Sequence, residues 1–304
     1  MWNRSHDPTP KDYYEPPQRE GVAMRLLRVG DFGSERPAVL SQENRLLDCS
    51  SFVTEFDGSF FSTGGVERLA SLSANGAFQE LDLTSLRIGA PVAKPEKIVC
   101  VGLNYTDHAA ETGAEVPSEP ILFLKVPGTL VGPNDDVLIP RNSVKTDWEI
   151  ELAVVIGRRA HYLSSPDVAL GYVAGYAISN DVSERSFQLE RGGTWDKGKG
   201  CDTFNPCGPW LLTADEVPDP QNIGLRLWVN GVERQNGTTA NMIFSVAHLI
   251  WYISQFMVLE AGDVINTGTP AGVALGNDHF LTYGDVVELE ADGLGRQRQA
   301  LRSA

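Results

Sequence analysis

Apolar and polar positions alternate over several short stretches of the chain, a pattern that is typical of β-strands. Residues 24–32 alternate before a glycine, and residues 38–49 form two short apolar runs around a polar turn. Further runs rich in β-branched and aromatic residues are bounded by Gly, Pro, Asn or Asp, and they cover residues 97–102, 120–125, 150–157, 170–179, 225–229 and 285–291. The pattern predicts a mostly β protein.

Helical periodicity and tight turns are clear in only a few places. Residues 66–78 predict a short helix that ends near Gly76. Asn230-Gly231 predicts a two-residue hairpin, because both positions of a type I′ turn need positive φ. The clearest helix lies within residues 244–256, where apolar side chains recur at helical spacing at Val246, Leu249, Ile250, Ile253 and Phe256.

Changes in composition divide the chain into three parts. Residues 1–23 carry four prolines among polar and charged residues and lack the pattern of a signal peptide, so we expect a flexible tail. Pro91 and Pro95 favour a linker. We therefore predict a small β-rich domain over residues 24–92 and a larger, mostly β domain over residues 93–304.

Charge and cysteine content exclude several classes of protein. The 304 residues include 25 basic and 40 acidic side chains, a net charge of −15 that disfavours nucleic-acid binding. No apolar run approaches the ~20 residues of a membrane span. The cysteines lack the spacing of a zinc site or of a disulfide framework, which favours reduced thiols in a cytoplasmic protein. They are Cys49, Cys100, Cys201 and Cys207.

Two glutamates lie within a strand-like segment at residues 146–157. Alternation puts Glu149 and Glu151 on one face, which turns apolar at Ala153 and Val155. At an effective dielectric of ~20, unit charges ~4 Å apart repel by roughly 4 kcal/mol, so a buried pair shares a proton or binds a cation. Oxygen ligands favour Mg²⁺, Mn²⁺ or Ca²⁺. The alternative is an exposed pair on a solvated strand.

Asp181 lies between a strand-like and a helical segment, where a third ligand could face the glutamates. Its alternative is a helix N-cap, because Asp181 and Glu184 have the spacing of a capping box.

Two further clusters carry chemistry. His108 and Glu111 are three residues apart, so on a helix the glutamate could orient the imidazole; a surface pair is the alternative. Lys197 and Lys199 lie in a glycine-rich stretch, and either could supply a fixed charge or face solvent. Residues 266–276 are also glycine-rich but match neither nucleotide-binding pattern, which argues against a nucleotide cofactor.

Taken in order, these clusters resemble the fumarylacetoacetate hydrolase family from about Lys97 to the C-terminus. The resembling segments are VGLNYTDHAAE, EPILFLK, GPNDDVLIP, TDWEIELAVVIG, GYAISNDVSERSFQ, KGKGCDTFNPCGPW, VNGVERQ and INTGTPAGV. The resemblance implies an α+β, mostly β fold with a mixed β-roll in the second domain, and a homodimer or a dimer of dimers. It also implies one Mg²⁺ or Mn²⁺ ion per chain, held by Glu149, Glu151 and Asp181.

The resemblance further assigns roles to individual side chains. His108 and Glu111 match the family's His-Glu pair on a mobile lid, and Lys199 matches a lysine beside the metal-bound substrate. Other positions keep an ordinary structural interpretation, namely Lys197, His161, His248 and His279. The positions that match substrate contacts are Lys125, Arg185, Gln188 and Thr269.

Within the family, the sequence from residue 146 to residue 222 looks most like bacterial hydrolases of 2,4-diketo-3-deoxy sugar acids of the L-fuconate and L-rhamnonate type; similar sequences are labelled ureidoglycolate lyase. The implied reaction cleaves a C–C bond of a small 2-keto acid through a metal-bound enolate and yields pyruvate and lactate. Oxaloacetate decarboxylation and keto-enol isomerisation are alternatives on the same site. A noncatalytic metal-stabilised binding protein is an alternative of another class, against which the joint presence of His108, Glu111 and Lys199 argues.

Overall fold

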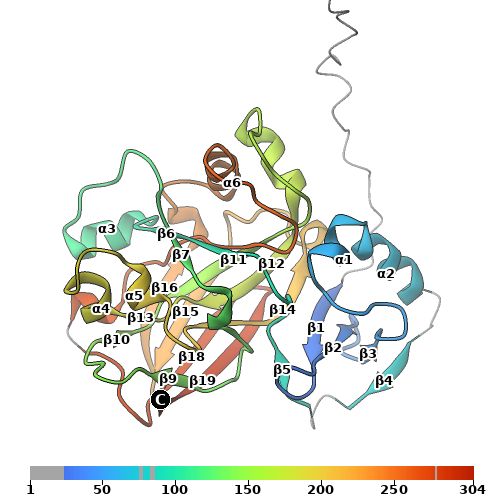
Figure 1. Cartoon of the computed structure of the whole chain (residues 1–304), viewed down its shortest axis with the longest axis horizontal. Coiled ribbons are helices and arrows are strands. Elements are labelled where there is room, and N and C mark those ends of the chain that lie inside the picture. Colours follow the sequence, from blue (N-terminus) through green and yellow to red (C-terminus); the bar gives the residue numbers. More distant parts are fainter. Residues whose placement is uncertain (1–23, 75–77, 83–85, 278) are drawn as a thin grey trace, which may run out of the picture.

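The computed structural model describes residues 24–74, 78–82, 86–277 and 279–304. Its strands form two large sheets, with short helices around them (Figure 1). The tail predicted at residues 1–23 and the helix end predicted near Gly76 lie outside the described residues. Within the described ranges, no helix combines the length and the apolar character that crossing a membrane requires.

The larger sheet has twelve strands, with the main order β4-β3-β2-β1-β14-β12-β11-β17-β6-β7. β5 pairs with β1, and β8 pairs with β14. Every neighbouring pair is antiparallel except β17 with β6 and β14 with β8. The strands are β1 Arg25–Val29, β2 Arg36–Leu40, β3 Leu46–Asp48, β4 Gln79–Leu81, β5 Ile88–Gly89, β6 Ile98–Gly102, β7 Ile121–Lys125, β8 Leu130–Val131, β11 Ile150–Ile156, β12 Val173–Asn180, β14 Asn205–Thr213 and β17 Val264–Asn266.

A second sheet of five strands has the order β16-β15-β18-β19-β9. β15 and β16 are joined by Asn230 and Gly231 at φ values of 51° and 76°, which confirms the predicted hairpin. The mostly β class is confirmed as well. The remaining strands are β9 Val137–Ile139, β15 Gly224–Val229, β16 Val232–Thr238, β18 Val286–Ala291 and β19 Gly295–Ser303, with a separate short pair formed by β10 Thr146–Asp147 and β13 Ser183–Glu184.

β11 lies between β12 and β17 in the sheet and is buried on both faces, because each face packs into a hydrophobic core. Ile150, Leu152 and Val154 belong to the main hydrophobic core. Ala153 and Val155 point to the other side and belong to a second core, which includes side chains of the N-terminal part. The predicted alternation along this strand is therefore confirmed, and both of its faces enter the protein interior.

The N-terminal strands continue the large sheet. Leu26 of β1 pairs with Leu211 of β14, and β2 and β3 pair with each other around the polar turn that the sequence predicts. Strands from both sides of residue 93 thus share one sheet. The division into domains at that residue stays a prediction.

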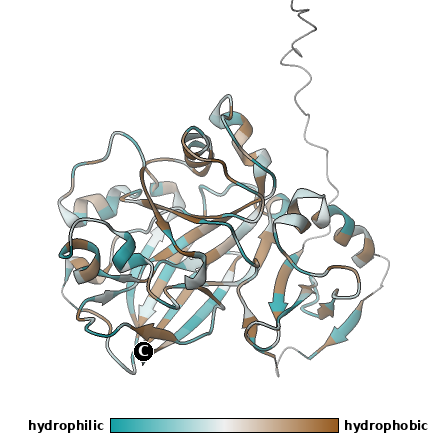
Figure 2. Ribbon diagram, viewed as in Figure 1, coloured by the Kyte–Doolittle hydropathy of each residue, from teal (hydrophilic) through white to brown (hydrophobic). Residues whose placement is uncertain are grey.

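The helices lie in two groups and one separate position (Figure 1). α3 Thr106–Thr112, α4 Arg185–Leu189 and α5 Asp196–Lys199 gather at the side opposite α1 Gly58–Ser62 and α2 Gly65–Ala74. α6 Val246–Ser254 is predominantly apolar (Figure 2) and buries the predicted residues from Val246 to Ile253. The prediction was wrong for Phe256, because α6 ends before it and its side chain is 65% exposed.

Candidate active site

Three carboxylates meet where β11 and β12 run side by side. Glu151 lies in β11, Glu149 directly precedes that strand, and Asp181 directly follows β12. Ile150 pairs with Asn180, and the backbone N–H of Asp181 donates to the carbonyl oxygen of Glu149 at 2.9 Å. As a result, one oxygen from each carboxylate lies within 4.8 Å of the other two. Strand pairing therefore creates the cluster that the sequence predicts.

The carboxylate cluster is buried, with exposures of 5% for Glu149, 1% for Glu151 and 0% for Asp181. The alternative of a solvated pair of glutamates is therefore wrong. Burial raises the pKa of Glu151 well above its usual value, and the charges of Asp181 and Glu149 raise it further. The surroundings of Glu151 therefore disfavour its charged form.

Two cations hold Glu149 from either side. Lys199 Nζ, from α5, lies 2.7 Å from Glu149 Oε2 and 3.1 Å from Asp181 Oδ2. Arg185 Nη2, from α4, lies 2.6 Å from Glu149 Oε1. Burial opposes ionisation of Glu149, but the charges of Lys199 and Arg185 outweigh it and lower the pKa of this carboxyl to about 2. Lys197, by contrast, is exposed and donates to the carbonyl oxygen of Arg191 at 2.7 Å.

Asp181 does not cap the helix that follows it. α4 begins at Arg185, and its N-cap is Glu184, whose side chain accepts a hydrogen bond from the N–H of Ser186 at 3.2 Å. The helix-cap interpretation of Asp181 was wrong because β13 separates this residue from the helix. Asp181 Oδ2 instead accepts no hydrogen bond, although it is buried.

Lys125 pairs with Asp181, and neither residue lines the cavity that Glu149 and Glu151 line. Its Nζ donates to Asp181 Oδ1 and, at 2.9 Å, to the carbonyl oxygen of Val182. Lys125 is 1% exposed. The resemblance implies a substrate contact at this position, whereas the geometry makes Lys125 a support for a carboxylate that faces the cluster.

His108 and Glu111 lie one turn apart on α3, with His108 Nδ1 3.3 Å from Glu111 Oε2. Both carboxylate oxygens of Glu111 also accept the N–H of Gly272 at 3.0 Å. Burial opposes ionisation of Glu111, but the bonds from His108 and Gly272 outweigh it and lower the pKa of this carboxyl. His108 is buried but Glu111 is exposed, so the surface-pair interpretation was wrong for His108 only.

A cavity of about 210 Å³ is lined by Glu149 and Glu151 of the carboxylate cluster and by His108 of the His-Glu pair. Its lining changes in character from the inside outward. The buried part is polar and consists mainly of His108, Glu149, Glu151, Arg185, Gln188, Lys199 and Thr269. The partly exposed part is mainly apolar and includes Leu103, Ala114, Leu189, Trp195 and Leu275. The cavity thus has a charged floor and an apolar mouth.

Gln188 and Thr269 both line this cavity, and their contact with a substrate stays a prediction. Gln188 Oε1 accepts a hydrogen bond from Arg185 Nη1 at 3.0 Å. Thr269 Oγ1 donates to the carbonyl oxygen of Ile150 at 2.8 Å and accepts from Gln235 Nε2 at 2.8 Å. Both side chains are therefore held in fixed orientations at the cavity wall.

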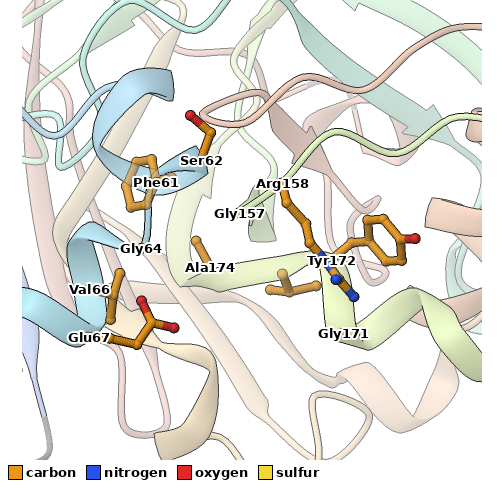
Figure 3. A pocket seen from close by; sticks show the side chains of 11 residues that line it. Phe61, Ser62, Gly64, Val66, Glu67, Gly157, Arg158, Gly171, Tyr172 and Ala174 are labelled. Carbon is orange, nitrogen blue, oxygen red and sulfur yellow. The ribbon is translucent and has the colours of Figure 1, made fainter. Parts of the chain in front are cut away.

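A second cavity, of about 220 Å³, lies between α1, α2 and the segments at the ends of β11 and β12 (Figure 3). Glu67 lies on its α2 side and Arg158 on the opposite side, where the guanidinium stacks 4.1 Å from the ring centroid of Tyr172. Both charged side chains are exposed. Among the described residues that line it, none is both charged and buried, so it lacks the features of the first cavity.

No sequence pattern pointed to Asp147, a buried carboxylate beside the site. Its Oδ2 accepts a hydrogen bond from Arg185 Nε at 2.7 Å, and its Oδ1 accepts the N–H of Ala274 at 2.7 Å. A lone aspartate without a spaced partner has no distinguishing pattern. Its partners are 38 and 127 positions away along the chain.

The carboxylate cluster fits a divalent cation that prefers oxygen ligands. Three buried carboxylates each offer an oxygen, and Asp181 Oδ2 makes no hydrogen bond, although Lys199 Nζ lies 3.1 Å from it as an ion-pair partner. Glu151 is oriented by the N–H of Gly268, which donates to its Oε2 at 2.7 Å. Hard oxygen donors of this kind suit Mg²⁺ or Mn²⁺ better than a thiophilic metal. All four cysteines are free, and none belongs to the cluster.

Comparison with known proteins identifies the family. A family model described as fumarylacetoacetate (FAA) hydrolase C-terminal matches residues 97–302. The chain belongs to the fumarylacetoacetate hydrolase family. The predicted family and fold class are therefore confirmed.

This member of the fumarylacetoacetate hydrolase family has relatives along nearly its whole length. It is 50% identical over 284 residues to a protein of Burkholderia ambifaria whose provisional name is hydrolase, and the match covers 92% of this chain and 100% of the relative. A fumarylacetoacetate hydrolase structure from Exiguobacterium antarcticum is 33% identical, with a TM-score of 0.81 and coverage of 92% and 100%.

A third match bears on the carboxylate cluster. The structure of maleylpyruvate hydrolase from a Sphingobium species, in complex with manganese(II) and pyruvate, is 27% identical, with a TM-score of 0.76 and coverage of 92% and 100%. A protein of similar fold thus binds manganese(II).

Proposed function

We propose that the protein is a divalent-metal-dependent hydrolase that cleaves the C3–C4 bond of a 2,4-diketo-3-deoxy sugar acid of the L-fuconate or L-rhamnonate type and yields pyruvate and lactate. The observation that carries the proposal is the position of His108, paired with Glu111, in the cavity that Glu149 and Glu151 of the carboxylate cluster also line. Support also comes from the relative that binds manganese(II) and pyruvate.

The charges at the floor of the cavity set how an anionic substrate binds. The four buried carboxylates of Asp147 and the cluster face three buried cations, at Lys125, Lys199 and Arg185, which leaves one negative charge in excess. A divalent ion would reverse the local excess of negative charge and favour a carboxylate at the floor. Arg185 and Lys199 would hold that carboxylate, and Gln188 and Thr269 would contact the adjoining oxygens.

The apolar mouth suits the other end of such a substrate. A 6-deoxy sugar acid ends in a methyl group, which needs no hydrogen-bond partner. Transfer of this group from water to an apolar surface is favourable. Leu189 and Leu275 offer it partly exposed apolar surface. The small volume of about 210 Å³ also favours a short chain.

His108 is placed to activate a water molecule. Its Nδ1 is engaged by Glu111, which leaves Nε2 as the nitrogen that can accept a proton. The carboxylate of Glu111 stabilises the imidazolium that forms. The activated water adds to C4, the C3–C4 bond breaks, and C3 then takes up a proton to give pyruvate, while C4 becomes the carboxylate of lactate.

A cation held by Glu149, Glu151 and Asp181 would supply Lewis acidity, polarising the C2 keto group and lowering the energy of the negative charge that develops as the bond breaks. The role of the chain in this step is to hold these three carboxylates in place and to keep water out of the floor of the cavity.

The deciding experiment measures pyruvate and lactate released from 2,4-diketo-3-deoxy-L-fuconate and its L-rhamnonate counterpart, with Mn²⁺, with Mg²⁺ and with EDTA. Oxaloacetate serves as the competing substrate. We expect metal-dependent pyruvate with one equivalent of lactate, and a large loss of turnover in Lys199→Ala. Turnover of oxaloacetate alone would support the decarboxylase. Proton exchange at C3 without cleavage would support the isomerase, and no turnover of any substrate would support the binding protein.

A further inference from the structure

Asp147 has 0% exposure and accepts four hydrogen bonds. Its Oδ1 accepts the backbone N–H groups of Trp148 at 2.8 Å and Ala274 at 2.7 Å. Its Oδ2 accepts the N–H of Leu275 at 3.1 Å and Nε of Arg185 at 2.7 Å. Hydrogen bonds to an ionised acceptor are among the stronger ones in proteins, so this carboxylate fixes all four donors.

One of these bonds leads to the carboxylate cluster. Arg185 uses Nε for Asp147 and Nη2 for Glu149, where the distance is 2.6 Å. Because the guanidinium is planar and rigid, two bonds on different nitrogens determine the plane in which it lies. Asp147 therefore sets the direction in which Arg185 faces the cavity.

Two other bonds lead to the His-Glu pair. Ala274 and Leu275 begin the 3₁₀ turn η7 Ala274–Gly276, two residues after Gly272. The N–H of Gly272 donates to both carboxylate oxygens of Glu111. Gly272 has a φ of 108°, and a Cβ atom there would lie 1.9 Å from the carbonyl oxygen of Arg234, so the backbone at this point has little freedom to adjust.

We propose that Asp147 is a positioning residue that couples Arg185, at the carboxylate cluster, to the turn that holds Glu111. The predicted effect of Asp147 on kcat and KM rests on the proposed function, whereas the coupling itself rests on geometry alone. Asp147 does not line the cavity, so it acts through Arg185 and the turn and not by contact with a substrate.

The test variant is Asp147→Asn, which keeps the size of the side chain and one acceptor oxygen. The amide NH₂ group of the new side chain would then face the N–H of Leu275 and the Nε–H of Arg185. Because an NH₂ group donates and cannot accept, both of these hydrogen bonds would be lost. Displacement of reacting groups by about 1 Å can cost 10²-fold in rate, and we expect kcat/KM to fall by about that factor. KM should rise through Arg185, and kcat should fall through Glu111.

A matched control variant is Asp263→Asn. Asp263 is also fully buried and accepts backbone N–H groups, from Lys97 at 3.0 Å and Glu260 at 2.7 Å, together with the Nζ of Lys97. None of its partners lines the cavity. We expect Asp263→Asn to lower thermal stability as much as Asp147→Asn does, with kcat/KM within about threefold of the parent.

A second readout does not need turnover. Hydrogen–deuterium exchange of the amides of Ala274 and Leu275 should become faster in Asp147→Asn and stay at the parental rate in Asp263→Asn. Arg185→Lys leaves Asp147 in place, and faster exchange at the same two amides in that variant would support coupling through the carboxylate. This measurement remains available if Asp147→Asn fails to fold.

The outcomes separate the two ideas. If the parent hydrolyses none of the diketo acids, the proposed function fails, and amide exchange in Arg185→Lys decides the coupling by itself. The coupling is overturned by parental exchange at Ala274 and Leu275 in Arg185→Lys, by parental kcat/KM in folded Asp147→Asn, or by an equal loss of kcat/KM in Asp263→Asn.

Discussion

Lys125 donates to Asp181 in an ion pair in which neither side chain has exposed surface. Removing one partner of a buried pair leaves an uncompensated charge and typically costs about 3–5 kcal/mol. We expect Lys125→Met to lower the free energy of unfolding of the metal-free protein by that amount, because methionine keeps the length of the chain but loses the charge. Mn²⁺ should recover part of the loss, since a cation at Asp181 replaces the missing one. Thermal unfolding with and without Mn²⁺ checks this.

Lys97→Met is the matched control, because Lys97 Nζ pairs with the buried carboxylate of Asp263 at 2.5 Å, away from the cavity. Its loss of stability should be the same with and without Mn²⁺. If Lys125→Met behaves in the same way, Lys125 does not support a metal ligand.

Glu111→Gln and His108→Ala test the proposed activation of water. Gln at position 111 can no longer stabilise an imidazolium, and loss of general-base catalysis typically costs 10²-fold or more. We expect kcat to fall by about that factor in both variants, with the dissociation constant for Mn²⁺ unchanged, as measured by calorimetry. Glu115→Gln, an exposed position just beyond α3, is the control and should keep parental kcat. Parental hydrolysis in either test variant would contradict the role of the pair.

Glu151→Gln tests the metal site. The amide oxygen of glutamine can still accept the N–H of Gly268, which now donates to Glu151 at 2.7 Å, so the variant should remain folded. Loss of a partner that only supports a metal ligand typically costs about 10- to 100-fold in metal affinity, so replacing a charged ligand itself should weaken Mn²⁺ binding by at least about 10²-fold. Titration with Mn²⁺, followed by electron paramagnetic resonance, measures the free ion. Unchanged affinity would place the metal elsewhere.

The stability of the N-terminal part should depend on pH through Glu35. Burial opposes ionisation of Glu35, but the bond from Arg87 and the charge of Arg28 outweigh it and lower the pKa of this carboxyl. Glu55 faces Arg28, and Asp135 faces Arg87. Because the pKa is lower in the folded state than in the unfolded state, the stabilisation is fully present above the unfolded pKa and is lost as pH falls through the folded pKa.

Chemical denaturation of Glu35→Gln should therefore show a deficit relative to the parent at pH 7 that shrinks as the pH falls below about 4.5, the usual value for this carboxyl. Glu80→Gln is the control, because Glu80 is exposed and lies 3.7 Å from the exposed Arg45. We expect almost no deficit there. A deficit in Glu35→Gln that does not change with pH would contradict the argument.

Much of this protein follows from local pattern. Alternation predicted β11 and both of its faces, because side chains on a strand point alternately to its two sides. Asn230-Gly231 predicted its hairpin, since few other pairs adopt positive φ at both positions. The spacing of His108 and Glu111 predicted that they would meet on one helical turn, as they do on α3.

The tertiary structure decided which interpretation of each local pattern holds. Strand pairing brings Asp181 beside Glu149, and β13 then removes it from the helix that it was a candidate to cap. Lys125 and Lys199 are both basic residues in resembling segments, yet only Lys199 reaches the cavity. The bond between Asp147 and Ala274 spans 127 positions. Such contacts depend on the order of strands in a sheet, which local periodicity does not encode. The sequence by itself therefore determined the elements and the chemical groups available. The packing of the sheet determined which of these groups meet.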